Sequence, residues 1–131
     1  MATRARINVV EDGEILVSIF HMYDGYPTHV GQKIKDILGN AVEEANGIGC
    51  LAATLNKGLK DRVGNVYIRN TSADDHGESY IYNLNMGEPL HAGDLMIEVH
   101  KDDGSVLYDG RLDKFDAVLA EALGRGEVTN E

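Results

Sequence analysis

Side chains that could bind a ligand or move a proton gather in one short stretch near the N-terminus. Within nine residues the chain places His21, Tyr23, Asp24, Tyr26 and His29. An imidazole exchanges a proton near neutral pH, and a tyrosine ring offers an apolar face with a polar tip. This combination suits a ligand that has both a flat ring and a phosphate or hydroxyl group, such as a nucleotide.

A helix start beside these side chains would add a site for an anion. Thr28 is a good N-cap residue, so we expect a helix to begin there. The first N–H groups of a helix are free and carry partial positive charge, which favours a phosphate. An alternative explains the same stretch without a ligand. Asp24-Gly25 forms a turn, and Tyr26-Pro27 forms a packed hinge.

Two arginines and one further tyrosine complete the candidate site. Arg4 begins the first expected strand, and Arg111 lies between a glycine and an expected helix, so each suits an anion contact. Tyr80 and Tyr82 share one face of a strand, where they would either stack on a base or pack across strands. The predicted ligand-binding residues are Arg4, His21, Tyr23, Asp24, Tyr26, Thr28, Tyr82 and Arg111.

Catalytic and metal-binding patterns are weaker. The loop that holds Asp74, Asp75, His76 and Glu78 matches no EF-hand or zinc spacing, and it is usual for such a loop to be solvated. Glu98 and His100 share a strand face and could do acid–base work, but no nucleophile accompanies them. No phosphate-binding loop, dinucleotide fingerprint or nucleophile elbow is present. We therefore expect no catalytic residues, no metal and no cofactor.

Charge is divided unevenly along the chain. The 131 residues have a net charge of −10, and the whole excess lies in residues 71–131, whereas residues 1–70 sum to zero. Repulsion from phosphates argues against direct binding to duplex nucleic acid. The acidic half would either keep the surface soluble or mimic DNA toward a host protein. A basic cluster, at Lys57, Lys60, Arg62 and Arg69, would receive phosphates or neutralise that half.

Residue spacing predicts the elements that must position these side chains. Alternating apolar residues predict strands at 4–10, 15–21, 66–70, 79–85, 95–101 and 105–110. Asp12-Gly13 and Asp103-Gly104 indicate hairpin turns. The strand at 79–85 is expected to pair with the one at 66–70. Helices are expected from Thr28, around Leu51–Leu59, and from a cap at Asp113 to just before Gly124.

The expected fold is α+β, with an antiparallel sheet built from hairpins and two or three helices packed on one face. Residues 1–124 would form a single domain, and 125–131 a flexible tail. Exposed sheet edges often pair with a second copy, so we expect a homo-oligomer. No apolar run is long enough for a membrane span, and we see no signal peptide. Cys50 is the only cysteine, so no internal disulfide can form, which suits the reducing cytoplasm. We expect Cys50 to be buried.

The first third of the chain resembles a group of small phage-encoded proteins. These begin with T-R-x-x-I and carry H-x-x-D-G-Y-P-x-x-x-G before the first helix, as this chain does at Thr3–Ile7 and His21–Gly31. In size, helix placement and a hairpin-rich second half the chain also looks like the phage sponge proteins that inhibit Thoeris immunity. That resemblance implies an oligomer that binds cyclic ADP-ribose-type signals without destroying them, in the cytoplasm of an infected bacterium.

The sequence therefore favours a non-enzymatic phage protein that sequesters a nucleotide-derived immune signal of the cyclic ADP-ribose or cyclic oligonucleotide type. In this hypothesis Tyr26 stacks on the base, Arg4 and Arg111 meet phosphate, and the helix start at Thr28 adds N–H groups. One alternative is an acidic DNA mimic that binds a host defence, nuclease or other DNA-binding protein. The other is a small metal- or histidine-dependent hydrolase that uses the Asp74–Glu78 loop or the Glu98/His100 pair.

Overall fold

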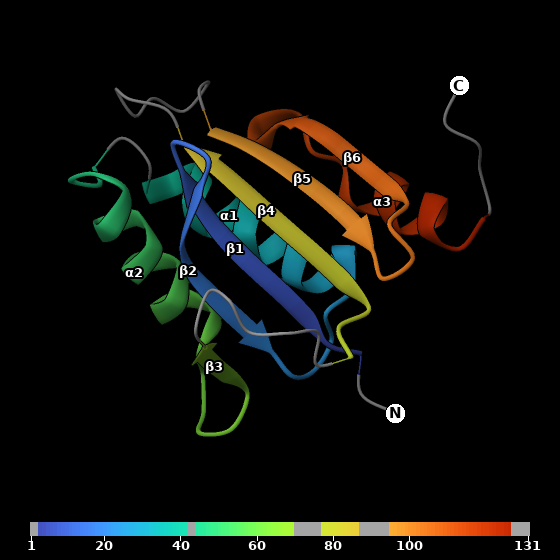
Figure 1. Ribbon diagram of the computed structural model, residues 1–131, viewed down its shortest axis with the longest axis horizontal. Helices are drawn as coiled ribbons and strands as arrows, with labels where there is room; N and C mark the ends of the chain where they lie inside the picture. The colour runs from blue at the N-terminus through green and yellow to red at the C-terminus, as the bar shows by residue number, and fades with distance from the viewer. Residues whose placement is uncertain (1–2, 42–43, 70–76, 87–94, 127–131) are drawn as a thin grey trace.

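The computed structural model describes residues 3–41, 44–69, 77–86 and 95–126. Its elements follow the predicted order, with two strands, two helices, four strands and a last helix (Figure 1). The strands are β1 (Ala5–Glu11), β2 (Glu14–His21), β3 (Val66–Arg69), β4 (Tyr80–Met86), β5 (Leu95–Lys101) and β6 (Val106–Arg111). The helices are α1 (Gln32–Ala41), α2 (Ile48–Leu59) and α3 (Ala117–Gly124).

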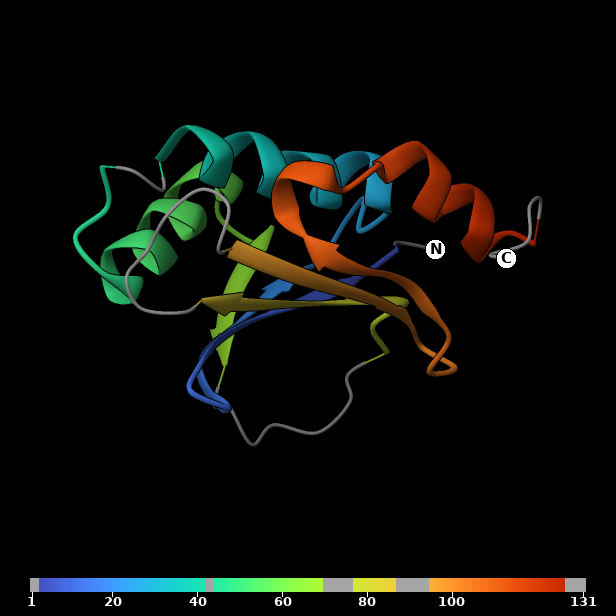
Figure 2. The ribbon, with the colours of Figure 1, turned by 90° about the horizontal axis from the view of Figure 1, so that it is seen from above.

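The six strands form one sheet in the order β3-β2-β1-β4-β5-β6. Neighbouring strands are antiparallel except β1 and β4, which are parallel and lie at the centre of the sheet (Figure 1). The three helices cover one face, as Figure 2 shows from above. The expected α+β class is confirmed. β3 and β6 lie at the two edges of the sheet.

The predicted pairing of β4 with β3 is wrong. β4 pairs instead with β1 and β5, while β3, among the described strands, pairs only with β2. Tyr82 and Leu84 are fully buried on β4, as is usual for a strand in the middle of a sheet. β3 has only four residues, and its last three are exposed, as befits a short edge strand.

Both hairpin turns form where the sequence places them. Asp12 and Gly13 join β1 to β2 with φ angles of 51° and 81°, and Gly104 lies between β5 and β6 with a φ of 88°. At the first of these turns both central positions have positive φ angles, which is typical of a two-residue turn that matches the strand twist.

The core lies between the sheet and the helices. Leu51, Leu55 and Leu59 of α2 point inward at the predicted spacing and are fully buried. Cys50 is exposed, against expectation, because the inward face of α2 is taken by these leucines and leaves the preceding position outside. No helix among the described residues is long and apolar enough to cross a membrane.

The start of the last helix also differs from the prediction. α3 begins at Ala117, and Asp116 caps it by accepting a hydrogen bond from the backbone N–H of Leu119 at 3.1 Å. Asp113, the predicted cap, lies in a short 3-10 turn and accepts a hydrogen bond from Arg111 at 2.7 Å. Of the predicted tail, residues 127–131 lie outside the described residues.

A row of hydrogen-bonded polar side chains crosses four strands on the face away from the helices. Ser18 Oγ donates to Asn8 Oδ1 at 2.7 Å, and Asn8 Nδ2 donates to Asn83 Oδ1 at 2.8 Å. Asn83 Nδ2 donates to the Glu98 carboxylate at 3.3 Å, and that carboxylate also bonds His100 Nε2. Ser18 and Asn8 are only 1% and 5% exposed, so the row is buried at its β1–β2 end. We refer to it as the polar row.

Candidate functional site

The corner between β2 and α1 contains most of the predicted site residues. Asp24 has a φ of 51°, and the backbone N–H of Gly25 donates to the carbonyl of Thr3 at 2.9 Å. A Cβ on Gly25 would lie 2.8 Å from the carbonyl carbon of Arg4. The glycine of the D-G-Y-P sequence is therefore required by the close approach of two backbone segments.

Tyr82 holds this corner in place and is not available to a ligand. Its ring is fully buried, and its hydroxyl donates to the carbonyl of Gly25 at 2.7 Å. Burial raises the pKa of that hydroxyl well above its ordinary value. The interpretation of the tyrosine pair as packing is thus correct for Tyr82, and its predicted role in stacking on a base is wrong.

Gly31, the last glycine of the sequence signature, also serves packing. A Cβ there would lie 3.1 Å from the ring of Phe115 and 3.3 Å from the ring of Tyr82. Pro27 is buried and opens a π-helical turn over Pro27–Gly31, which α1 then continues. The turn residues of the signature are therefore explained by close packing.

Thr28 is not the N-cap of this helix, because the helical turn already begins at Pro27. The backbone N–H and the hydroxyl of Thr28 both donate to one oxygen of Glu121, at 3.2 and 2.6 Å. A carboxylate of α3 thus lies where we expected an external phosphate. The predicted anion site at the helix start is taken by an anion of the protein itself.

Glu121 should make the stability of this junction depend on pH. Burial alone would raise the pKa of Glu121, but the hydrogen bonds from Thr28 and the charge of Arg125, 3.0 Å away, lower it below its ordinary value of 4.5. The unfolded chain therefore takes up the proton first. The stabilising contribution is complete above about pH 4.5 and is lost as the pH falls through the lower pKa of the folded state.

Glu121→Gln should accordingly flatten the acid limb of the stability profile. Urea unfolding of both proteins between pH 3 and 6 would check this, with the wild type losing more of its advantage as the pH falls. Parallel curves for the two proteins would show that the carboxylate charge contributes nothing.

Beside the corner lies a small polar cavity, which we call the corner hollow. Its volume is about 60 Å³. Three predicted site residues line it, together with side chains of α1 and of the segment before β3. The lining residues are His21, Tyr23, Asp24, His29, Val30, Lys33, Asp61, Arg62 and Asn65.

Buried polar atoms in the corner hollow lack hydrogen-bond partners. His21 and Asn65 are 5% and 3% exposed. Within the described part of the chain, neither ring nitrogen of His21 makes a hydrogen bond of good geometry, although the Tyr23 backbone lies near the ring, and Oδ1 of Asn65 has no partner. The Asn65 amide nitrogen is satisfied by the Leu59 carbonyl and by Asp61, so only its oxygen is left over. Such groups are rare in folded proteins and call for a bound water or ligand.

The electrostatics of the corner hollow favour a neutral His21. Burial lowers the pKa of His21 below 6.5, and the nearby charge of Lys33 lowers it further, whereas the Tyr23 backbone and two carboxylates only partly offset this. A neutral imidazole presents one hydrogen-bond donor and one acceptor. Lys33 and Arg62 supply the positive charges of the lining, and Asp24 and Asp61 the negative ones.

The two corner tyrosines have different positions. Tyr23 is 44% exposed, lines the corner hollow, and lies under the guanidinium of Arg62, 5.5 Å from the ring centre. Tyr26 is 37% exposed but does not line the corner hollow, and its ring packs near His29 and Tyr80 at 6.1 and 6.2 Å. Tyr23 is therefore better placed than Tyr26 to cover a group held there.

The structure does not bring Arg4 and Arg111 together. Arg4 comes just before Ala5 at the start of β1. Ala5 pairs with Tyr80 of β4, and Tyr80 pairs with Lys101 at the end of β5. Arg111, at the end of β6, pairs with Met96 near the start of β5. It therefore lies at the end of the sheet opposite to the one near Lys101 along the strand direction. Within one chain, the two arginines therefore cannot contact a phosphate together at the corner. Arg4 lines a separate hollow of about 280 Å³ with Ala5, Phe20, Met22, Arg69 and Glu78.

Sequence reasoning missed the four polar lining residues of the corner hollow that lie outside the His21–His29 stretch: Lys33, Asp61, Arg62 and Asn65. The pairing of β2 with β3 sets His21 opposite Val66, and Met22 donates to the carbonyl of Asn65 at 2.9 Å. This contact brings the polar segment before β3 to the corner. The only sequence signal was the basic cluster that contains Arg62, which we considered as a phosphate receptor without placing it here.

The structure gives no support to a metal site in the described part of the chain. No group of three or more His, Cys, Asp or Glu side chains is placed for a metal ion within the described ranges. Asp74, Asp75 and His76 lie outside them, and Glu78 is buried 3.7 Å from Arg6. No family model, curated protein or solved structure matches the chain. The corner hollow must therefore be judged by its own chemistry.

Proposed function

We propose that the protein binds and sequesters a nucleotide-derived signal, of the cyclic ADP-ribose or cyclic oligonucleotide type, at the corner hollow and leaves it intact. The observation that carries this proposal is the set of unpartnered buried atoms on His21 and Asn65, which face a cavity bordered by Lys33 and Arg62. The resemblance to phage proteins supports the ligand class and a cytoplasmic role during infection. Homo-oligomer formation stays a prediction.

The size of the corner hollow defines how such a ligand would bind. A cavity of about 60 Å³ is much smaller than the ~300–1,000 Å³ of pockets that enclose a whole ligand. It has room for one polar group, such as a phosphate or a ribose hydroxyl. The ring system of the ligand would lie outside, against the exposed face of Tyr23, where stacking on an aromatic side chain is worth ~1–3 kcal/mol per base.

The lining chemistry supports binding over turnover. His21 is the buried base candidate, yet the described lining contains no Ser, Thr or Cys that it could activate as a nucleophile. Within the described residues the Glu98–His100 pair belongs to the polar row and not to this cavity. A ligand held here would meet hydrogen-bond donors and acceptors but no hydroxyl or thiol activated by His21.

A thermal-shift screen with cyclic dinucleotides, cyclic trinucleotides and cyclic ADP-ribose isomers tests the proposal. Ligand at about 100 times its Kd should stabilise the native state by ~2.7 kcal/mol and raise the Tm by several degrees. Tyr23→Ala should weaken binding about tenfold or more, because the stacking face is lost. Tyr67→Ala is the matched control, since Tyr67 is equally exposed at 45% but lies on β3 outside the corner hollow.

Two outcomes would contradict the proposal. If no compound in the screen raises the Tm, the corner hollow is not a nucleotide site and would hold ordered water instead. Recovery of a cleaved product after the complex is denatured, in place of intact ligand, would show that the protein is an enzyme.

A further inference from the structure

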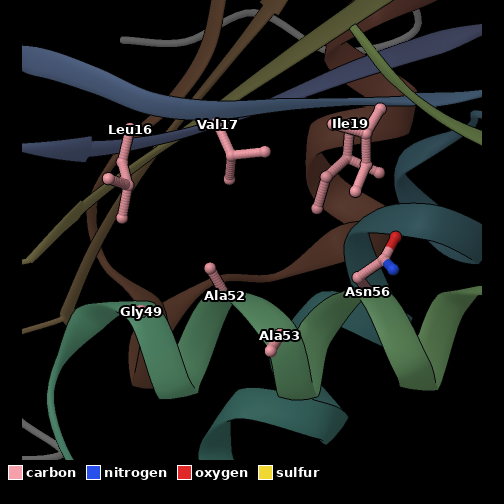
Figure 3. Close-up of a pocket in the computed structure, with 8 residues that line it drawn as sticks. Leu16, Val17, Ile19, Gly49, Ala52, Ala53 and Asn56 are labelled. Carbon is pink, nitrogen blue, oxygen red and sulfur yellow. The ribbon is translucent and has the colours of Figure 1, made fainter.

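A second cavity, quite different in chemistry, lies between α2 and the edge of the sheet. It is an apolar groove of about 380 Å³, which we call the α2 groove (Figure 3). Strands β2 and β3 form one wall and helix α2 the other. The lining residues are Leu16, Val17, Ile19, Gly49, Ala52, Ala53, Asn56 and Ile68.

The α2 groove exists because one face of α2 carries only small side chains. Gly49, Ala52 and Ala53 recur at helical spacing, so they lie on one face of the helix, opposite Val17 and its neighbours on β2 (Figure 3). The large residues of α2 point elsewhere, into the core. Leaving apolar surface in water costs roughly 25 cal/mol per Å², so an open apolar groove of this size is better filled than empty.

One polar atom in the α2 groove lacks a partner. Asn56 lies at one end, across from Ile19, while Gly49 and Leu16 lie at the other (Figure 3). Oδ1 of Asn56 is buried and accepts no hydrogen bond within the described residues. A carbonyl oxygen that has lost its water needs a donor, and nothing else in the lining supplies one.

We propose that the α2 groove binds a small apolar molecule that carries a single hydrogen-bond donor. The apolar part would lie between Ala52 and Val17, and the donor would reach Oδ1 of Asn56. The volume falls within the ~300–1,000 Å³ that is usual for small-molecule sites. Among the residues that the structure describes, no charged one lines the α2 groove, so a phosphorylated ligand would be desolvated there without a counter-charge from them. This site is therefore separate from the corner hollow and does not depend on the proposed function.

A pair of probes that differ in one donor tests this inference. Indole has a ring N–H, whereas 1-methylindole has the same ring without a donor. Titration followed by NMR should give saturable shifts of the Ala52, Ala53 and Ile19 methyl groups, with indole bound about fivefold more tightly. Asn56→Ala should remove this preference while both probes still bind. Equal affinities in the wild type, or no saturable binding, would overturn the proposal.

Filling the α2 groove gives a second test. Ala52→Leu should abolish binding of both probes, and Ala53→Leu on the exposed side serves the same purpose if the first variant does not fold. Lys57→Leu adds the same side chain to an exposed position of α2 outside the lining and should leave binding unchanged. A protein that is dimeric by sedimentation, binds neither probe and becomes monomeric on Ala53→Leu would assign the α2 groove to a second copy instead.

Discussion

Gly25→Ala should lower the free energy of unfolding by about 2–3 kcal/mol, because the added methyl group would clash with neighbouring atoms. It would lie 2.8 Å from the carbonyl carbon of Arg4 and 2.9 Å from Cβ of Ala5. The first of these atoms belongs to the backbone segment that leads into β1. The carbonyl of Thr3 in the same segment accepts the hydrogen bond from the N–H of Gly25. Relief would require the corner to move away from the sheet. Urea unfolding at neutral pH measures the loss.

The same substitution elsewhere should have the opposite effect. Gly39 lies within α1, and a Cβ there meets nothing within 4 Å. Gly39→Ala should therefore stabilise the protein by ~0.5–1 kcal/mol, through the lower conformational freedom of the unfolded chain. If both variants change stability equally, the clash at Gly25 is not what constrains the corner.

Asn8→Leu should lower the free energy of unfolding by about 2 kcal/mol, because it breaks the polar row at its buried β1–β2 end. Asn8 joins Ser18 to Asn83, and its removal leaves the Ser18 hydroxyl, 1% exposed, without its acceptor. A buried polar group that loses its partner pays its full desolvation penalty. Asn85→Leu is the control, since Asn85 is an exposed residue of β4 and should change stability by only about 0.5 kcal/mol.

A double-mutant cycle separates the lost hydrogen bond from lost packing. Ser18→Ala leaves Asn8 Oδ1 unpaired, whereas the double variant Asn8→Leu/Ser18→Ala removes both partners at once. The double variant should thus cost clearly less than the sum of the two single variants. Additive costs would mean that the bond between Asn8 and Ser18 contributes no coupling.

Local pattern was sufficient for the elements but not for their pairing. Asp12-Gly13 and Asp103-Gly104 act between neighbours in sequence, so the two hairpins could be predicted from a few residues. The parallel pairing of Ala5 with Tyr80 joins segments that share no turn. No local signal distinguishes it from the pairing of β3 with β4 that we expected.

The candidate site shows the same limit. Period-two spacing correctly puts Tyr80 and Tyr82 on one face of β4, but it does not say that this face is the core. Arg4 and Arg111 each suit an anion, yet whether they meet depends on the register of four strands. Residue type identified His21, Tyr23 and Asp24, whereas Arg62 and Asn65 join them only through the pairing of β2 with β3.

The parallel pairing of β1 with β4 also means that the sheet cannot be completed until β4 has been synthesised. The first three strands and two helices precede β4 in the chain and emerge from the ribosome before it, so one edge of β1 is unpaired until β4 follows. Closing so long a loop is slow, and an open central strand invites pairing with other chains in the meantime. The half that arrives later carries the whole excess negative charge, so repulsion between chains grows only as β4 arrives to cover that edge.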